Sequence, residues 1–105
     1  MKIAVKELRQ KIVGTLKEGF TQEESDRIAD YLLWADMSGI KTQGVIKMTG
    51  SEPLQHVKPK HDIKIERDTN LSQLINGGAN PALLVSQKAT DVAIEKAKEH
   101  GFGIV

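Results

Sequence analysis

The chain has 105 residues, a mass of 11.6 kDa, 39% hydrophobic and 28% charged residues, a formal net charge of +1 and no cysteine. This length allows one small domain with a modest core, and the composition is typical of a soluble globular protein. The low net charge gives no argument for binding nucleic acid or an anionic membrane, and the lack of cysteine excludes disulfides and thiolate chemistry within these residues. No segment has the apolar length of a signal peptide or a membrane span, so a cytoplasmic protein is expected.

Two amphipathic helices are predicted at the N-terminus, packed as a hairpin. Apolar residues recur every four positions from Val5 to about Gly19, which predicts the first helix. Thr21 and Glu24 form a capping-box pattern, so the second helix should run from Gln22 to about Met37 and stop at Gly39. The residues expected to face inward are Val5, Leu8, Ile12, Val13, Leu16 and Phe20 in the first helix and Ile28, Ala29, Leu32, Leu33 and Ala35 in the second.

The stretch "SGIKTQGVIKM", residues 38–48, comes closest to showing chemistry. Thr42 can cap a short helix "QGVIKM", which places Gln43 in its first turn and Lys47 one turn later on the same face. Free backbone N–H groups, the positive end of the helix and an ammonium would then meet at one spot, which suits a carboxylate or a phosphate. A linker with a solvated lysine explains the same pattern, and periodicity alone favours the linker.

A β-hairpin is predicted after the polar loop "TGSEPLQHVKPKHD". In "DIKIERD", Ile63 and Ile65 alternate with Lys64 and Glu66, which predicts a half-buried strand. After the turn "DTN", the segment "LSQLI" (residues 71–75) provides the second strand.

A long third helix and a terminal strand complete an α+β fold. In "NGGANP", Asn80 is the expected N-cap and Pro81 the first helical residue of a helix that continues to about His100 and is capped by Gly101. "GFGIV" then reads as the opening of a buried strand, and an unpaired strand there predicts that the chain self-associates. The third-helix residues expected to face inward are Leu84, Val85, Ala89, Val92, Ala93 and Ala97.

Other candidate sites have simpler explanations. "NGGANP" lacks the lysine and serine or threonine of a P-loop and the spacing of a Rossmann turn, so turn geometry accounts for it. His56 and His61 have no clear third ligand, and His100 suits a helix C-terminus, so no metal site is expected. Trp34 is expected in the core or at an interface.

The order of these segments resembles the N-terminal part of the malate/L-lactate dehydrogenase family, a non-Rossmann group that includes ureidoglycolate, sulfolactate and diketogulonate reductases. The resemblance rests on "ADMSGI", on the "GV" at Gly44-Val45 and on "AIEKAKEHGFGIV". It implies that residues 1–105 form a single domain, the N-terminal portion of a longer dehydrogenase fold. It also implies hydride transfer between NAD or NADP and a 2-hydroxy or 2-oxo acid, carried out by a dimer.

The family pattern Ser-His-Gly-Val-x-Arg falls on residues 42–47, within the stretch "SGIKTQGVIKM". Thr42 takes the serine position, Gln43 that of the acid/base histidine, and Lys47 that of the arginine that holds the substrate carboxylate. Glutamine carries no proton near neutral pH, whereas lysine keeps the charge without the bidentate fork. Most cofactor-binding segments of the family lie downstream, so the chain alone is expected to be inactive. The alternative is a non-catalytic oligomerisation or protein-binding module that uses the helical face and the edge at Ile104 and Val105.

Overall fold

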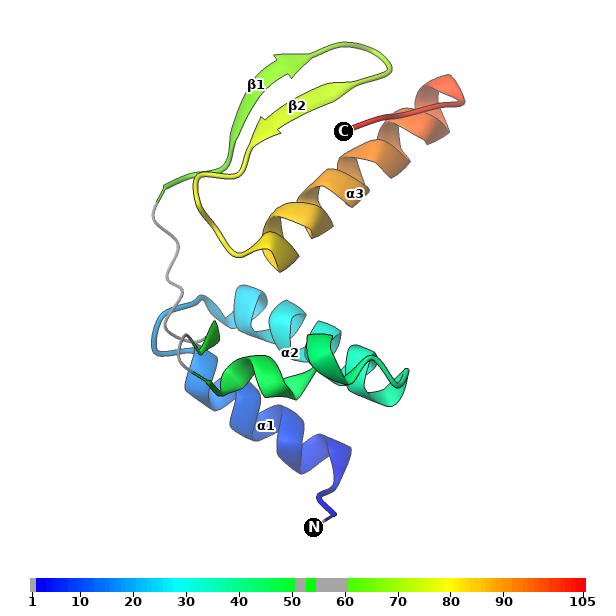
Figure 1. Ribbon diagram of the computed structural model, residues 1–105. Coiled ribbons are helices and arrows are strands. Elements are labelled where there is room, and N and C mark those ends of the chain that lie inside the picture. The colour runs from blue at the N-terminus through cyan, green and yellow to red at the C-terminus, as the bar shows by residue number, and fades with distance from the viewer. Residues whose placement is uncertain (1, 51–52, 55–60) are drawn as a thin grey trace. The chain divides into compact units, whose positions relative to one another are not determined.

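The computed structural model describes residues 2–50, 53–54 and 61–105, which form two compact units, unit 1 (Met1–Lys58) and unit 2 (Pro59–Val105). The predicted α+β order is confirmed at the level of helix pair, β-hairpin and long helix (Figure 1). No helix within the described ranges is long and apolar enough to cross a membrane. His56 and most of the predicted polar loop fall outside the described residues. The elements are α1 Val5–Leu16, α2 Gln22–Met37, the 3-10 turns η1 Lys41–Gln43 and η2 Val45–Met48, β1 Lys64–Asp68, β2 Gln73–Asn76 and α3 Ala82–His100.

The ends of α2 are those that its local sequence predicts. The Thr21 hydroxyl accepts from the backbone N–H of Glu24 at 3.2 Å, and the Glu24 carboxylate accepts from the N–H of Thr21 at 2.9 Å. Gly39 follows the helix with a φ of +83°, a conformation that favours glycine. α1 ends at Leu16, slightly earlier than predicted.

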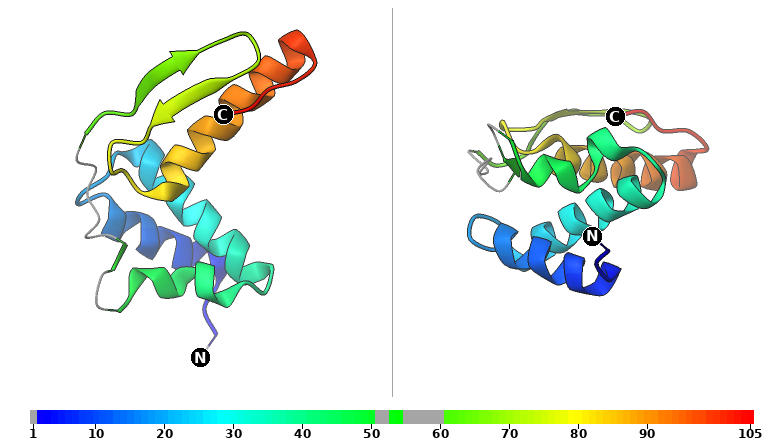
Figure 2. Two further views of the ribbon diagram at one scale, coloured as in Figure 1. Left: turned by 45° about the horizontal axis from the view of Figure 1, so that its top comes forward. Right: turned by 60° about the horizontal axis from the view of Figure 1, so that its bottom comes forward.

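The core of unit 1 lies between α1 and α2, which run side by side (Figure 2). All five residues predicted to face inward from α2 are buried. In α1 the prediction is wrong for Val5, which opens the helix and is 52% exposed, since the buried residues of α1 lie in its second half. Arg9 adds a polar link, since its guanidinium contacts Asp30 at 2.7 Å and Asp26 at 3.3 Å. The buried apolar residues are Ile12, Val13, Leu16, Phe20, Ile28, Ala29, Leu32, Leu33 and Ala35.

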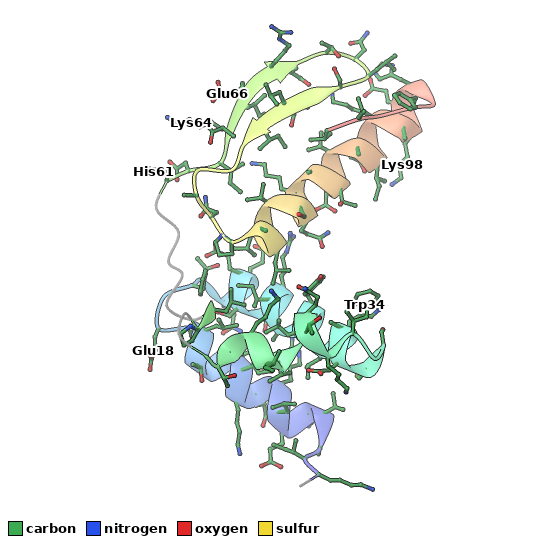
Figure 3. The ribbon with its side chains drawn as sticks, viewed as in Figure 1. Glu18, Trp34, His61, Lys64, Glu66 and Lys98 are labelled. Atoms are coloured by element: carbon green, nitrogen blue, oxygen red, sulfur yellow. The ribbon has the colours of Figure 1, made fainter. Side chains whose placement is uncertain are left out.

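Trp34 is not a core residue, contrary to one of its two predicted placements. Its side chain projects outward from α2 and is 57% exposed (Figure 3). The Tyr31 ring lies beside it with a centroid distance of 6.0 Å, and Met37 is 71% exposed. α2 therefore carries a second apolar strip in addition to the one that it buries.

The predicted hairpin is present in unit 2 as two antiparallel strands with Ile65 opposite Ile75. A bulge at Glu66 shifts the register, and Lys64 and Glu66 lie on one side of β1 (Figure 3). The prediction of a half-buried first strand is wrong in this structure, because every residue of β1 is exposed and Ile65 is 56% exposed. β2 begins at Gln73.

The terminal segment is paired, which corrects the prediction of a free strand. Ile104 forms a parallel bridge with Ser72: its N–H donates to the Leu71 carbonyl at 2.9 Å, and its carbonyl accepts from the Gln73 N–H at 2.9 Å. In Figure 1 this segment turns back from α3 and runs beside β2. The premise for self-association through an unpaired strand is therefore lost, and a dimer stays a prediction.

α3 keeps its predicted length, but its first residues differ from the prediction. Pro81, not Asn80, is the N-cap. The Asn80 amide instead donates to the carbonyls of Gly77 at 2.7 Å and His61 at 2.6 Å. Gly101 caps the other end with a φ of +83°, as expected. Of the residues predicted to face inward, Ala97 is exposed, and Leu84, Val85, Ala89, Val92 and Ala93 are half-buried.

A cation joins α3 to the hairpin turn. The Lys96 ammonium lies 2.7 Å from the Asp68 carboxylate and donates to the Thr69 carbonyl at 2.6 Å, while its side chain is 13% exposed. Lys96 holds the pKa of Asp68 below its usual 3.8, with a smaller contribution from a hydrogen bond donated by Gln73.

This pair predicts an acid-sensitive contribution to the stability of unit 2. Because the folded-state pKa of Asp68 is depressed, its contribution is fully present above the unfolded value near 3.8 and is lost as the pH falls through the folded value. In thermal unfolding, Lys96→Met should therefore lower the melting temperature at pH 7 and make progressively less difference below pH ~4. An equal effect of the substitution at neutral and strongly acidic pH would contradict this assignment.

Candidate substrate-binding segment

Within residues 38–48, the short helix predicted over residues 43–48 is not formed. The segment consists of η1 and η2, separated at Gly44, whose φ is −92° and ψ −148°. Thr42 lies inside η1 and caps nothing, since neither turn has a side-chain cap. The helical spacing that would place Gln43 and Lys47 on one face is therefore absent.

Asp36, in the last turn of α2, explains the break. Its carboxylate accepts from the backbone N–H of Val45 at 2.6 Å. Gly44 is buried, and a Cβ at that position would collide with the Asp36 carboxylate. Lys41 adds a second link, donating to the Asp36 backbone carbonyl at 3.1 Å with its ammonium 3.6 Å from the carboxylate. A glycine is required here because the aspartate occupies the side-chain position.

One backbone donor of the predicted anion site is bound by the chain itself. The sequence predicted that the N–H of Val45 could bind a carboxylate or a phosphate, but in the structure it donates to Asp36. The sequence analysis missed this role of Asp36. The segment "ADMSGI" contained a signal, because a carboxylate in the last turn of a helix interacts unfavourably with the helix dipole and is expected only where other contacts stabilise it.

The predicted site residues differ in exposure. Thr42 and Gln43 are exposed, and Lys47 is half-buried. Over residues 2–50, 53–54 and 61–105, Lys47 takes part in no ion pair or hydrogen bond of its ammonium, whereas Lys41 is held by Asp36. Lys47 is therefore the cation of this segment that is available to a carboxylate.

The glycine loop at residues 76–80 is a turn in this structure. The N–H of Gly78 donates to the Asn76 side chain at 3.0 Å, and the Asn80 amide binds the Gly77 carbonyl. In this loop and in the segment at Val45, one backbone N–H is thus bound by a side chain of the chain itself, Asn76 and Asp36 respectively.

The histidines in the described residues do not gather into a metal site. His100 lies near Glu99, with 3.7 Å between Nε2 and the carboxylate, at the C-terminal end of α3. No group of three histidine, aspartate or glutamate side chains that could hold a metal ion occurs in the part of the chain that the structure describes.

Comparison with known proteins decides the family. The model of the family described as malate/L-lactate dehydrogenase matches residues 3–105. The chain belongs to this family.

Several family members are similar to the chain in sequence. The L-sulfolactate dehydrogenase of Methanothermobacter thermautotrophicus is 37% identical over 87 residues, which is 80% of this chain and 26% of that protein. The malate/(S)-sulfolactate dehydrogenase of Methanothermus fervidus is 33% identical over 109 residues, covering 100% of this chain and 32% of that protein. The chain therefore spans between a quarter and a third of the length of these relatives.

Solved structures of the family share the fold. Malate dehydrogenase from Pyrococcus horikoshii OT3 superposes with a TM-score of 0.88 and 25% identity, over 98% of this chain and 31% of that chain. Sulfolactate dehydrogenase from Methanocaldococcus jannaschii gives a TM-score of 0.84 and 27% identity, over 93% of this chain and 30% of that chain. The helix pair, 3-10 turns, hairpin and long helix thus match part of the dehydrogenase fold of this family.

Proposed function

We propose that this chain forms the substrate-carboxylate edge of an NAD(P)-dependent 2-hydroxy acid dehydrogenase, of which it is the N-terminal portion. The observation that carries the proposal concerns Lys47, which takes the position of the family's arginine by resemblance. Of the two lysines in residues 38–48, Lys41 is held by Asp36, whereas Lys47 has no ion-pair partner among the described residues. A lysine attracts a carboxylate as a point charge, without the two parallel hydrogen bonds of an arginine.

Gln43 would bind the substrate without moving a proton. Its amide can donate to the 2-oxo oxygen, and it is exposed and free to do so. It cannot act as the general acid in the direction of reduction. Because Asp36 binds the Val45 N–H and Asn76 binds the Gly78 N–H, cofactor binding would fall to segments outside residues 1–105. The chain alone is therefore inactive, and a dimer is the expected assembly.

Two experiments test this proposal. The first is a titration of NADH fluorescence with the chain alone, followed by a panel of 2-oxo acids. We expect no saturable binding, and NADH oxidation would contradict the assignment of cofactor binding to other segments.

The second uses a chimera in which this chain replaces the matching N-terminal segment of the Methanothermus fervidus malate/(S)-sulfolactate dehydrogenase. Lys47→Ala in the chimera should raise KM for malate about 10- to 100-fold, because a charged hydrogen bond is lost, with a smaller change in kcat. Lys6→Ala, at an exposed lysine of α1, is the matched control and should leave KM unchanged. An equal KM in the two variants would refute the role of Lys47.

A second candidate is a non-catalytic oligomerisation or protein-binding module. The exposed apolar strip of α2, with Tyr31, Trp34 and Met37, favours it, because aromatic and methionine side chains are enriched at interfaces. The chimera separates the two candidates. A binding module predicts that substitutions at Gln43 and Lys47 leave substrate kinetics unchanged.

A further inference from the structure

The backbone from Gln43 to Lys47 is weakly held by its own hydrogen bonds. The N–H of Gln43 donates to Ile40 and that of Lys47 to Gly44, at 3.1 and 3.0 Å, and each bond closes one 3-10 turn. No helical bond passes across Gly44, where the two turns part. The relative position of Gln43 and Lys47 therefore depends on what holds Gly44 and Val45.

Asp36, in the last turn of α2, holds Gly44 and Val45 in place. Its carboxylate binds the Val45 N–H and fills the space beside Gly44, and its own carbonyl accepts from Lys41. These contacts act on both turns, since Lys41 begins η1 and Val45 begins η2. The side chain of Asp36 is 26% exposed, so its hydrogen bond is partly shielded from water.

The placement is unfavourable for α2 itself. Asp36 precedes the last residue of the helix, whose last turn contains no basic residue. A carboxylate there faces the negative end of the helix dipole. The contacts that compensate for this cost all lie in the segment that contains Gln43 and Lys47.

We propose that Asp36 is the positioning residue of the substrate edge, with its carboxylate locking the turn at Gly44 and Val45 and so setting where Gln43 and Lys47 lie. This inference rests on the proposed function for its consequence in substrate binding. Its structural part stands on the contacts of Asp36 alone.

The test uses the full chain labelled with ¹⁵N, with two readouts: hydrogen exchange of the Val45 amide, and the shifts caused by oxamate, an unreactive analogue of a 2-oxo acid. Asp36→Ala should speed exchange at Val45 about 10- to 100-fold relative to its neighbours and abolish the oxamate shifts at Gln43 and Lys47. Asp36→Asn should restore most of both, because the amide oxygen can accept the same hydrogen bond. Exchange at Val45 as fast in Asp36→Asn as in Asp36→Ala would show that this hydrogen bond does not hold the turn.

Matched variants test whether the effect is local. Asp30→Ala removes a carboxylate of the same helix that binds Arg9 and should change neither readout. Gly44→Ala inserts a Cβ into the Asp36 carboxylate and should reproduce the effect of Asp36→Ala, whereas Gly14→Ala, where a Cβ meets open space, should not.

The outcomes separate the two proposals. Wild-type exchange at Val45 in Asp36→Ala would overturn the positioning role. A second outcome is that Asp36→Ala speeds hydrogen exchange at Val45 as expected, while oxamate causes no shift in the wild-type chain. This outcome would refute the substrate-binding function and would leave the role of Asp36 in holding the turn intact.

Discussion

Gln43→His raises the turnover of the chimera with malate by about 10²- to 10⁴-fold, the usual contribution of general acid–base catalysis. Gln43 stands at the family's histidine position and is exposed on η1, so an imidazole can be accommodated there without repacking the core. Histidine exchanges a proton near neutral pH, whereas the glutamine amide does not. The gain should appear in kcat, because in the proposed site the Gln43 amide already hydrogen-bonds the substrate oxygen.

Steady-state kinetics of malate oxidation and the reverse reduction check this prediction. Gln10→His, at an exposed glutamine of α1 in the same unit, is the matched control and should leave kcat at the level of the unmodified chimera. If turnover of the Gln43→His chimera is unchanged or lower while it still binds NADH, position 43 has a different role in this chain.

Leu32→Ala lowers the free energy of unfolding by about 2–5 kcal/mol, because it leaves a cavity in a core that does not fully relax. Leu32 is fully buried between α1 and α2, among the largest enclosed side chains of unit 1. A chain of 105 residues has roughly 5–15 kcal/mol of stability, so this one substitution removes a large share of it.

Urea unfolding followed by Trp34 fluorescence measures the effect, since Trp34 is the only tryptophan and lies on the same helix as Leu32. With an m value of about 1–3 kcal/mol/M, the midpoint should fall by at least about 0.7 M and by as much as about 5 M. Leu74→Ala is the matched control: this leucine is 61% exposed, and the expected change is about 0.5 kcal/mol or less. Equal midpoints for the two variants would show that Leu32 is not central to the core.

Features that depend on neighbouring residues could be predicted from the sequence. The capping box of Thr21 and Glu24 and the glycine stop at Gly39 mark the ends of α2 because their interactions span only a few residues. The five residues predicted to face inward from α2 follow from helical periodicity, because residues three and four positions apart share one face. The family resemblance followed from the same local segments, and it identified positions 42, 43 and 47 as the place to look.

The conformation of residues 38–48 depends on contacts between residues that are farther apart in the sequence. Residues 43–47 carry enough helical periodicity to predict one helix, but the carboxylate of Asp36 takes the Val45 N–H and the space beside Gly44, and two short turns result. Asn80 fits the pattern of an N-cap, yet its side-chain amide donates to the carbonyl of His61, which precedes the hairpin. The sequence predicts an unpaired strand at Ile104, but in the structure Ile104 forms a parallel bridge with Ser72, just before β2.

By itself, the sequence determined both ends of α2 and the order of helix pair, hairpin and long helix, because capping, turn and periodicity signals act between residues a few positions apart. Only the tertiary structure decided that Asp36 fills the space beside Gly44 and binds Lys41, and that Lys47 has no ion-pair partner among the described residues. A side chain from another element can accept a hydrogen bond from a backbone N–H as well as a helical carbonyl can. No local sequence pattern shows which of the two acceptors the N–H will bind.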